Sequence, residues 1–329
     1  MINRNRLFAT TAALVLAGAG VAGADQAPHL TLVAYSTPRE AYAGIIPAFT
    51  RTPAGQGVTF DQSFGASGDQ SRAVEAGLPA DIVAFSLQPD VTRLVKDGLV
   101  SPNWAKNAYH GMVTDSVVVI VVRAGNPKGI HGWGDLTKPG VEVITPNPFT
   151  SGGARWNVMA AYGAQITQGK TPQQAIAYLG DLFAHVAVQD KSARESLQTF
   201  VGGKGDAMLA YENEAIQAKR AGNAIEYIVP GDTILIENPV ATVRGSGNAL
   251  AAQAFVDFLY SPTAQNIFGG FGYRPVVESV AKTFNFPKVA HLSRISDFGG
   301  WDVVQTLFFD PHKGIIAQIE AKNGVSVGQ

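Results

Sequence analysis

Three short segments of the chain combine serine, glycine and other small residues in a way that suits anion binding. They are GASGDQ (65–70), TSGGAR (150–155) and DKSARES (190–196), and each joins a strand-like run to a helix-like run. The first N–H groups of a helix lack intrahelical partners and carry about half a positive charge. Gly152 and Gly153 let an anion approach this backbone, and Ser151 adds a hydroxyl donor. The loops could hold an anion with neutral donors, or each serine could simply cap a helix, and composition alone does not separate the two.

Other kinds of chemistry find little support in the sequence. The six histidines are scattered without metal-binding spacing, at positions 29, 110, 131, 185, 291 and 312. Ser151 lacks the G-x-S-x-G setting of a nucleophile, and VGGKGD (201–206) lacks the Ser or Thr that completes a phosphate loop. We therefore expect neither catalysis, nor a metal, nor a cofactor.

Alternating strand-like and helix-like runs predict two α/β units. Expected strands lie at 29–36, 57–65, 80–86, 116–123, 141–146, 186–189, 226–230 and 240–244, and expected helices at 39–50, 68–77, 89–98, 153–165, 172–184, 192–201, 251–261 and 261–270. Residues 206–215 are expected to be a strand that enters a helix. The second unit is expected to be inserted into the first. The predicted first lobe comprises 25–115 and 238–329, and the second 116–237, with hinge strands near 113–122 and 226–244. Ligands of such sheets bind beyond the carboxyl ends of the strands, so we expect a cleft between the lobes.

The beginning of the chain predicts export. Arg4 and Arg6 precede an apolar run that ends in Ala22-Gly23-Ala24, so residues 1–24 are expected to be a signal peptide rather than a membrane anchor. The chain has no Cys, which excludes disulfides and a lipid-modified cysteine. Its formal net charge of -1 gives no indication of nucleic-acid binding.

One long run resembles the periplasmic sulfate-binding proteins of ABC importers. It is GNPKGIHGWGDLTKPGVEVITPNPFTSGGARWNVMAAYG (125–163), and the likeness extends through STPRE, FGASG, SARESLQTF, YENEA, YSPTAQ and GGW (299–301). The resemblance implies a two-lobed type II periplasmic binding protein fold, α/β throughout, in which each lobe is a mixed, mainly parallel sheet flanked by helices. It further implies a monomer of the periplasm that closes on a dehydrated sulfate ion and delivers it to a membrane permease driven by an ATPase.

The same resemblance implies particular ligand contacts. Backbone N–H groups of Ser67, Gly152, Gly153 and Ala193 and the hydroxyl of Ser151 would bind the anion, while Arg155 and Arg194 would support the loops from behind. Asp69 and Glu195 are expected to face away from the anion.

Two expected contacts depart from the family pattern. Tyr211 stands where the family usually has Trp, and Ser36 where it usually has an acidic residue. Sulfate carries no proton at neutral pH and prefers donors only, whereas Tyr can donate or accept. We expect Tyr211 to donate to sulfate. Thiosulfate, a molybdate-like oxyanion and phosphate remain alternative ligands, and sensing or scavenging remains an alternative to transport.

Overall fold

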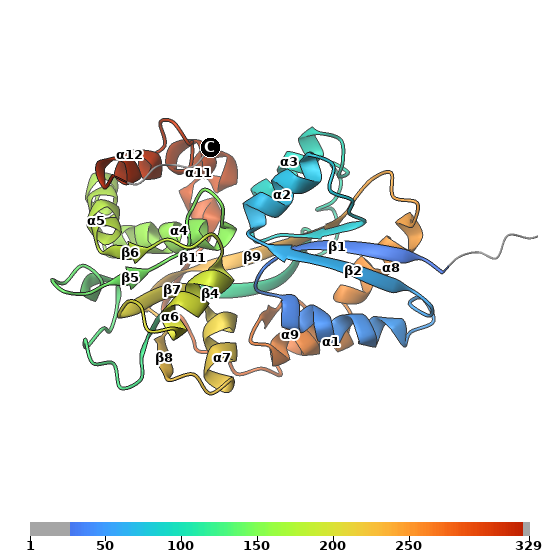
Figure 1. Ribbon diagram of the computed structural model, residues 1–329, viewed down its shortest axis with the longest axis horizontal. Coiled ribbons are helices and arrows are strands. Elements are labelled where there is room, and N and C mark those ends of the chain that lie inside the picture. Colours follow the sequence, from blue (N-terminus) through green and yellow to red (C-terminus); the bar gives the residue numbers. More distant parts are fainter. Residues whose placement is uncertain (1–26, 325–329) are drawn as a thin grey trace, which may run out of the picture.

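The computed structural model describes residues 27–324, so the predicted signal peptide lies outside the described residues. Two groups of elements stand side by side and are joined by two long strands, β4 (Met112–Arg123) and β9 (Asp232–Thr242) (Figure 1). Strands from both groups form one continuous sheet, in the order β2 (Thr59–Gly65), β1 (His29–Tyr35), β3 (Ile82–Ala84), β9, β4, β7 (Ala207–Tyr211), β5 (Val143–Ile144) and β6 (Val186–Val188). The molecule is thus two-lobed, and its lobes share a central pair of strands.

Lobe 1 begins with the predicted β-α-β-α-β-α succession. Its elements are β1 (His29–Tyr35), α1 (Arg39–Thr50), β2 (Thr59–Gly65), α2 (Ser67–Glu75), β3 (Ile82–Ala84) and α3 (Gln88–Lys96), followed later in the chain by α8 (Ala249–Leu259), α9 (Pro262–Gly270), β10 (Arg274–Pro275) and α10 (Glu278–Ala281). Strand β1 pairs in parallel with β2 and with β3. One face buries an aromatic cluster in which Phe49 packs edge-on against Phe255, with ring centroids 5.1 Å apart.

Lobe 2 follows the same alternation. It contains η1 (Trp133–Asp135), β5 (Val143–Ile144), α4 (Gly152–Thr167), α5 (Pro172–Ala184), β6 (Val186–Val188), α6 (Ala193–Val201), β7 (Ala207–Tyr211), α7 (Glu212–Arg220) and β8 (Ile225–Ile228). Sequence signals explain individual boundaries. Thr171 and Gln174 form a capping box at the start of α5, with Pro172 at the first helical position. Helix α4 is buried almost all round, because strands lie on one side of it and helices on the other.

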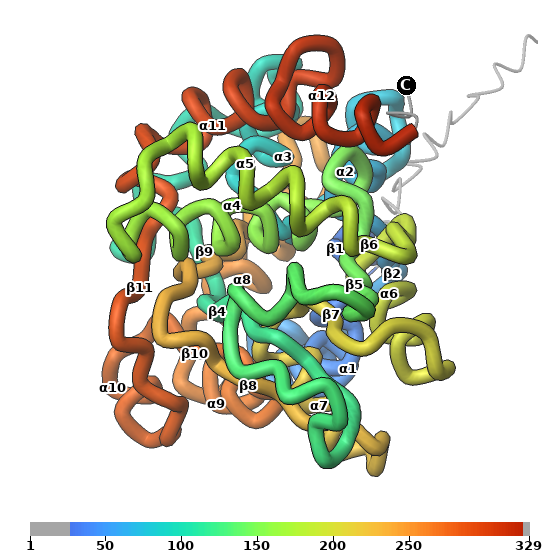
Figure 2. Tube along the Cα trace, turned by 90° about the vertical axis from the view of Figure 1, so that its left-hand side faces the viewer, coloured from blue at the N-terminus to red at the C-terminus, as the bar shows by residue number. Residues whose placement is uncertain are grey.

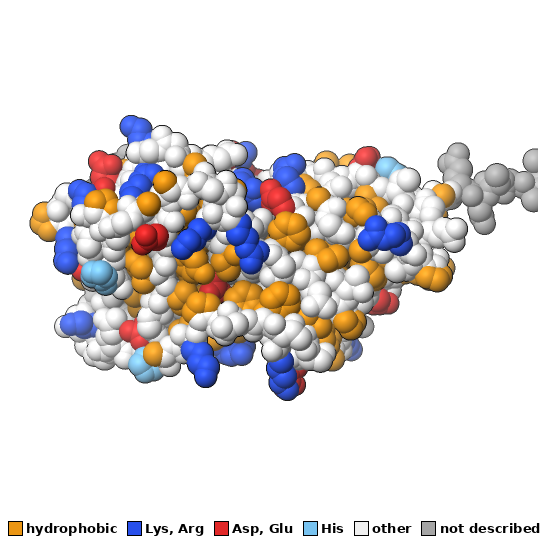
Figure 3. All heavy atoms as spheres, turned by 90° about the horizontal axis from the view of Figure 1, so that it is seen from below, with side chains coloured by type: hydrophobic (Ala, Val, Ile, Leu, Met, Phe, Trp, Pro, Cys, Tyr) orange, Lys and Arg blue, Asp and Glu red, His pale blue; other side chains and the backbone are white. Residues whose placement is uncertain are grey.

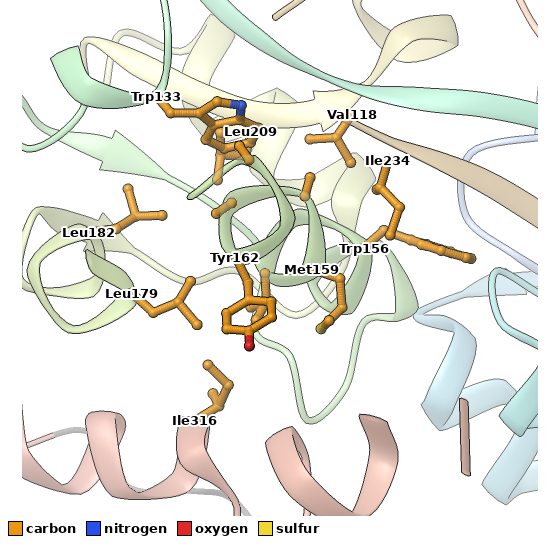
Figure 4. Packing of buried hydrophobic residues seen from close by; sticks show 14 of the residues in the cluster. Val118, Trp133, Trp156, Met159, Tyr162, Leu179, Leu182, Leu209, Ile234 and Ile316 are labelled. Carbon is orange, nitrogen blue, oxygen red and sulfur yellow. The ribbon is translucent and has the colours of Figure 1, made fainter. Parts of the chain in front are cut away.

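The C-terminal segment lies against lobe 2, whereas the sequence assigned all of 238–329 to lobe 1. This segment comprises β11 (His291–Ser293), η2 (Ile295–Phe298), α11 (Gly300–Phe308) and α12 (Ile315–Lys322). Ile316 joins the core around Met159 and Tyr162 of α4 and Leu179 of α5 (Figure 4). Trp301 packs edge-on against Trp156, with ring centroids 4.7 Å apart. Burial of these apolar side chains decides the placement, and we place 291–322 with lobe 2.

The surface is chemically mixed. On the face of Figure 3, Lys and Arg side chains lie singly among apolar and neutral atoms. The tube of Figure 2 shows α11 and α12 lying along α4 and α5 at the outer side of lobe 2. Of the helices between residues 27 and 324, none combines the length and apolarity that a membrane crossing requires.

Candidate functional site

An enclosed cavity lies where the three predicted loops meet between the lobes. Its walls are formed by Tyr35, Ser36, Thr37, Ala66, Ser67 and Ser86 from lobe 1 and by Ser151, Gly152, Gly153, Ala193 and Tyr211 from lobe 2. All seven residues predicted to contact the ligand are in this set. The structure therefore brings them together, while their contact with an anion stays a prediction. Each of the lining side chains is neutral, so hydrogen-bond donors and dipoles set the electrostatics of the cavity.

Three helices begin at the cavity wall. Helix α2 starts at Ser67, α4 at Gly152 and α6 at Ala193. The Oγ of Ser192 caps α6 by accepting a bond from the N–H of Glu195 at 3.3 Å, whereas Ser151 makes no such cap bond. The amides of the first residues lack intrahelical acceptors, so this arrangement turns several donors toward one small volume.

One amide near the cavity is already engaged. The N–H of Gly68 donates to the carbonyl of Thr150 at 3.0 Å, a backbone bond that joins lobe 1 to lobe 2. This bond fixes the beginning of α2 beside the loop that leads into α4. The donors of the two lobes are thereby held against each other.

Gly152 is required by a close approach across the cleft. A Cβ at this position would lie 2.6 Å from the Oγ of Ser86 and 2.8 Å from the Cγ of Leu87. Neither distance is tolerable without movement of lobe 1. At Gly153 a Cβ would lie 3.5 Å from the ring of Tyr211, an ordinary contact. Steric demand for glycine is therefore concentrated at the first residue of α4.

Ser67 is oriented by a buried carboxylate. Its Oγ donates to Asp90 at 2.6 Å and accepts from the N–H of Ser86 at 2.9 Å. Asp90 is 2% exposed, and burial raises its pKa, while the charge of Arg155 opposes this rise. The hydroxyl of Ser67 is thus occupied, and its backbone N–H is the group left for a ligand.

Ser86 is a candidate site residue that the sequence reasoning missed. It lies two residues after the end of β3 and two residues before the start of α3, in the segment AFSLQPD. Its Oγ lies 2.5 Å from the hydroxyl of Tyr211 in the other lobe. The signal was present, because this serine also occupies a turn from strand to helix, but no glycine marks it.

The two supporting arginines lie outside the cavity lining and hold different parts of it. Arg155 donates to the carbonyl of Pro148 and to the side chain of Gln305, each at 2.7 Å, and so secures the loop before α4. Burial lowers the pKa of Arg155 to about 10. Its second bond reaches α11, so the C-terminal segment also supports this loop.

Arg194 connects the lobes. It donates to both carboxylate oxygens of Glu40 in α1, at 2.8 and 2.7 Å, and to the carbonyl of Thr37 at 3.3 Å. On its other side Glu214 lies 3.7 Å away, and burial raises the pKa of Glu214 to about 7. The bidentate bond to Glu40 is the stronger of the two interactions, because its geometry is the shorter and matches the guanidinium fork.

The acidic residues next to the loops do not line the cavity. Asp69 pairs with Arg72 and lies 3.1 Å from Lys191, and Glu195 is exposed. Within the described part of the chain, no three His, Asp or Glu side chains come together as metal ligands would. The arrangement can therefore surround an anion with neutral groups.

Comparison with known proteins identifies the family of the chain. The family model described as "Bacterial extracellular solute-binding protein" matches residues 30–274. A sulfate-binding protein of Synechococcus elongatus is 43% identical over 87% of this chain and 85% of its own length. A thiosulfate-binding protein of Pseudomonas aeruginosa is 34% identical over 97% and 99%.

A solved structure extends the likeness to three dimensions. The sulfate-binding protein SubI of Mycobacterium tuberculosis H37Rv superposes with a TM-score of 0.84 at 45% identity, covering 86% of this chain and all of that one. The fold is the two-lobed periplasmic binding protein fold that the sequence predicted. The chain belongs to the bacterial extracellular solute-binding proteins.

Proposed function

We propose that this protein binds sulfate outside the cytoplasm and delivers it to the permease and ATPase of an ABC importer. The supporting observation is the enclosed cavity, in which helices α2, α4 and α6 all begin and every lining side chain is neutral. A dianion that carries no proton is best matched by donors alone, and a carboxylate in the wall would repel it. The names of the similar proteins support the same ligand.

The proposed contacts follow from the cavity wall. The N–H groups of Ser67, Gly152, Gly153 and Ala193, the hydroxyl of Ser151 and the N–H of Ser36 would surround the ion, with the hydroxyl of Tyr211 in the same wall. Hydrogen bonds to a charged group contribute about 1.5–3 kcal/mol each. Fixed amides and hydroxyls can thus replace the hydration shell of sulfate without any cation in contact with it.

Isothermal titration calorimetry tests this function. Sulfate, thiosulfate, molybdate and phosphate are titrated at pH 6, 7 and 8 into protein freed of anions by dialysis. We expect sulfate to bind most tightly, with little dependence on pH, and thiosulfate next, since a relative bears that name. Tighter binding of phosphate than of sulfate would show that the ligand is wrong.

A further inference from the structure

The hydroxyls of Ser86 and Tyr211 form a contact that joins the lobes at the cavity wall. Their oxygens lie 2.5 Å apart, and either can be the donor. Both residues line the cavity, and both are 1% exposed. Because the hydroxyls come from opposite lobes, this contact exists only while the lobes are together.

Ser86 is fixed by its backbone. Its carbonyl accepts bonds from the indole N–H of Trp156 at 2.9 Å and from the side-chain amide of Asn238 at 3.2 Å. Its N–H donates to Ser67 at 2.9 Å. With the main chain held from three directions, rotation about χ1 is the freedom left to the hydroxyl. Ser86 is therefore a positioned group, unlike a surface serine.

The position of Ser86 Oγ places it among the proposed anion donors. A Cβ on Gly152 would lie 2.6 Å from this oxygen, so the hydroxyl is next to the first residue of α4. An oxyanion bound to the N–H of Gly152 would lie beside Ser86. The hydroxyl of Tyr211 lies within one hydrogen bond of that of Ser86.

Counting hydrogens shows what the pair can offer. Two hydroxyls bring two hydrogens, and their mutual bond uses one. Burial raises the pKa of Tyr211 far above its ordinary value, so the phenol keeps its hydrogen. A phenol is a better donor than an aliphatic hydroxyl, and when Tyr211 donates to Ser86, the hydrogen of Ser86 is left for a ligand. The Oγ of Ser86 also keeps a free lone pair, so it can accept a hydrogen from a protonated ligand while it still accepts from Tyr211.

We propose that Ser86 is a specificity-determining ligand contact. Together with Tyr211 it donates one hydrogen bond to a fully deprotonated tetrahedral oxyanion and can accept one from a singly protonated oxyanion. The inference rests on the proposed function and deepens it. A fixed N–H donor at position 211 could only donate. The ligand class therefore includes hydrogen phosphate as a weaker ligand beside sulfate.

Calorimetry at pH 8 on the full mature chain tests the proposal with sulfate and with inorganic phosphate. We expect Ser86→Ala to weaken sulfate binding about 10- to 100-fold, the effect of losing a bond to a charged group. Tyr211→Phe should weaken it less, about 3- to 10-fold, because Ser86 keeps its hydrogen but loses the polarising donor. The sulfate affinity of the double variant Ser86→Ala/Tyr211→Phe should match that of Ser86→Ala within about threefold, because Tyr211 acts on the ligand through the hydroxyl of Ser86.

Selectivity is tested by replacing the pair with a fixed donor. The variant Ser86→Ala/Tyr211→Trp should bind phosphate at least about tenfold more weakly relative to sulfate than the unchanged protein does. Thr92→Ala is the matched control, because this hydroxyl of α3 bonds only to the carbonyl of Gln88. Thermal unfolding verifies that each variant folds. If the Trp variant does not fold, the sulfate affinities of Ser86→Ala and Tyr211→Phe still decide whether Ser86 is a ligand contact.

The outcomes separate this inference from the function on which it rests. If the unchanged protein binds no sulfate, the proposed function fails. If it binds sulfate but Ser86→Ala changes affinity less than about twofold, Ser86 is not a ligand contact and the inference is overturned. No measurable phosphate binding by the unchanged protein, or an unchanged selectivity ratio in the folded Trp variant, overturns the accepting role of the pair.

Discussion

Serines at comparable turns of this protein perform different tasks, and their neighbours decide which. Ser67 donates to buried Asp90, Ser192 caps α6, and Ser151 makes no cap bond and lines the cavity. The composition of each loop predicted an anion site or a helix cap without separating the two. Only the arrangement in space shows that a carboxylate from α3 reaches Ser67. The type of residue limits what a site can do, and its partners decide what it does.

The close approach at Gly152 leads to a residue-scale prediction. Gly152→Asp should abolish detectable sulfate binding in calorimetry, because the side chain collides with Ser86 and brings a negative charge to the anion site. Gly152→Ala should weaken binding at least about tenfold through the collision alone, equivalent to about 1.4 kcal/mol.

The control for this prediction carries the same change of charge elsewhere. Gly180 of α5 has open space where a Cβ would be added, so Gly180→Asp should leave the affinity for sulfate unchanged. Sulfate affinity that survives in a folded Gly152→Asp variant would remove the start of α4 from the site.

At the scale of elements, the helices and strands near the loops were predictable from the sequence, whereas the full length of β9, one of the two strands that join the lobes, was not. The strand predicted at 226–230 corresponds to β8, but the strand predicted at 240–244 is only the end of a longer β9, which begins at Asp232 and includes Asn238 and Pro239. Proline lacks an N–H, so it weakens a strand prediction. Here β9 keeps its pairing, because the carbonyl of Pro239 accepts from Phe85 at 3.0 Å and its partner strand shifts register near Met112.

The C-terminal elements illustrate a second limit. No element was predicted after residue 270, and all of 238–329 was assigned to lobe 1. Trp301 and Ile316 pack on lobe 2 instead. Local patterns identify a helix, whereas the choice between two apolar surfaces depends on contacts distant in sequence. Ser86 escaped notice for a related reason, since its partner Tyr211 is 125 residues away.

The crossing strands contain a pair of acids that makes stability depend on pH. Asp115 of β4 lies opposite Glu237 of β9 and Arg274 of β10, and Arg294 lies 3.2 Å from Glu237. Burial, and next the charge of Glu237, raise the pKa of Asp115 to about 7. Burial also raises the pKa of Glu237, against the charges of Arg294 and His110.

The sign of the effect follows from proton binding. Between about pH 4 and pH 7 the folded protein keeps the proton of Asp115 that the unfolded chain releases, so the free energy of unfolding falls as pH rises. Asp115→Asn should remove this contribution. The free energy of unfolding of the variant minus that of the unchanged protein should therefore be about 1–2 kcal/mol larger at pH 8 than at pH 4.

Urea unfolding from pH 4 to pH 8 measures that difference. Glu214, whose pKa burial also raises to about 7, is present in both proteins and cancels in the comparison. Asp302→Asn changes an exposed carboxylate of α11 and should leave the pH profile as it was. Parallel profiles for Asp115→Asn and the unchanged protein would contradict the prediction.

At the scale of the whole molecule, the cavity and the contacts between lobes form one system. The lining is neutral, while charges join the lobes around it through Arg194 and Glu40 and through Lys191 and Asp69. Sulfate can shift the equilibrium toward closure only by its greater affinity for the closed state. Neutral donors from both lobes supply that difference, since neither lobe alone surrounds the ion.

Closure is therefore expected to depend on ligand, and the absence of Cys from the sequence makes it measurable. Ala43→Cys in α1 and Gln198→Cys in α6 introduce two exposed labelling sites, near Glu40 and Arg194 respectively. Double electron–electron resonance between spin labels should give a broad distribution of long distances without anion and a narrow distribution of short distances with saturating sulfate.

Adding Glu40→Gln to the labelled protein should leave a larger open fraction at the same sulfate concentration, because the bidentate bond between Glu40 and Arg194 exists only across the closed cleft. Glu278→Gln, which breaks an exposed pair with Lys282 inside lobe 1, should not. Identical distributions with and without sulfate would show that the donors of the two lobes meet before the ligand arrives, and that binding does not drive closure.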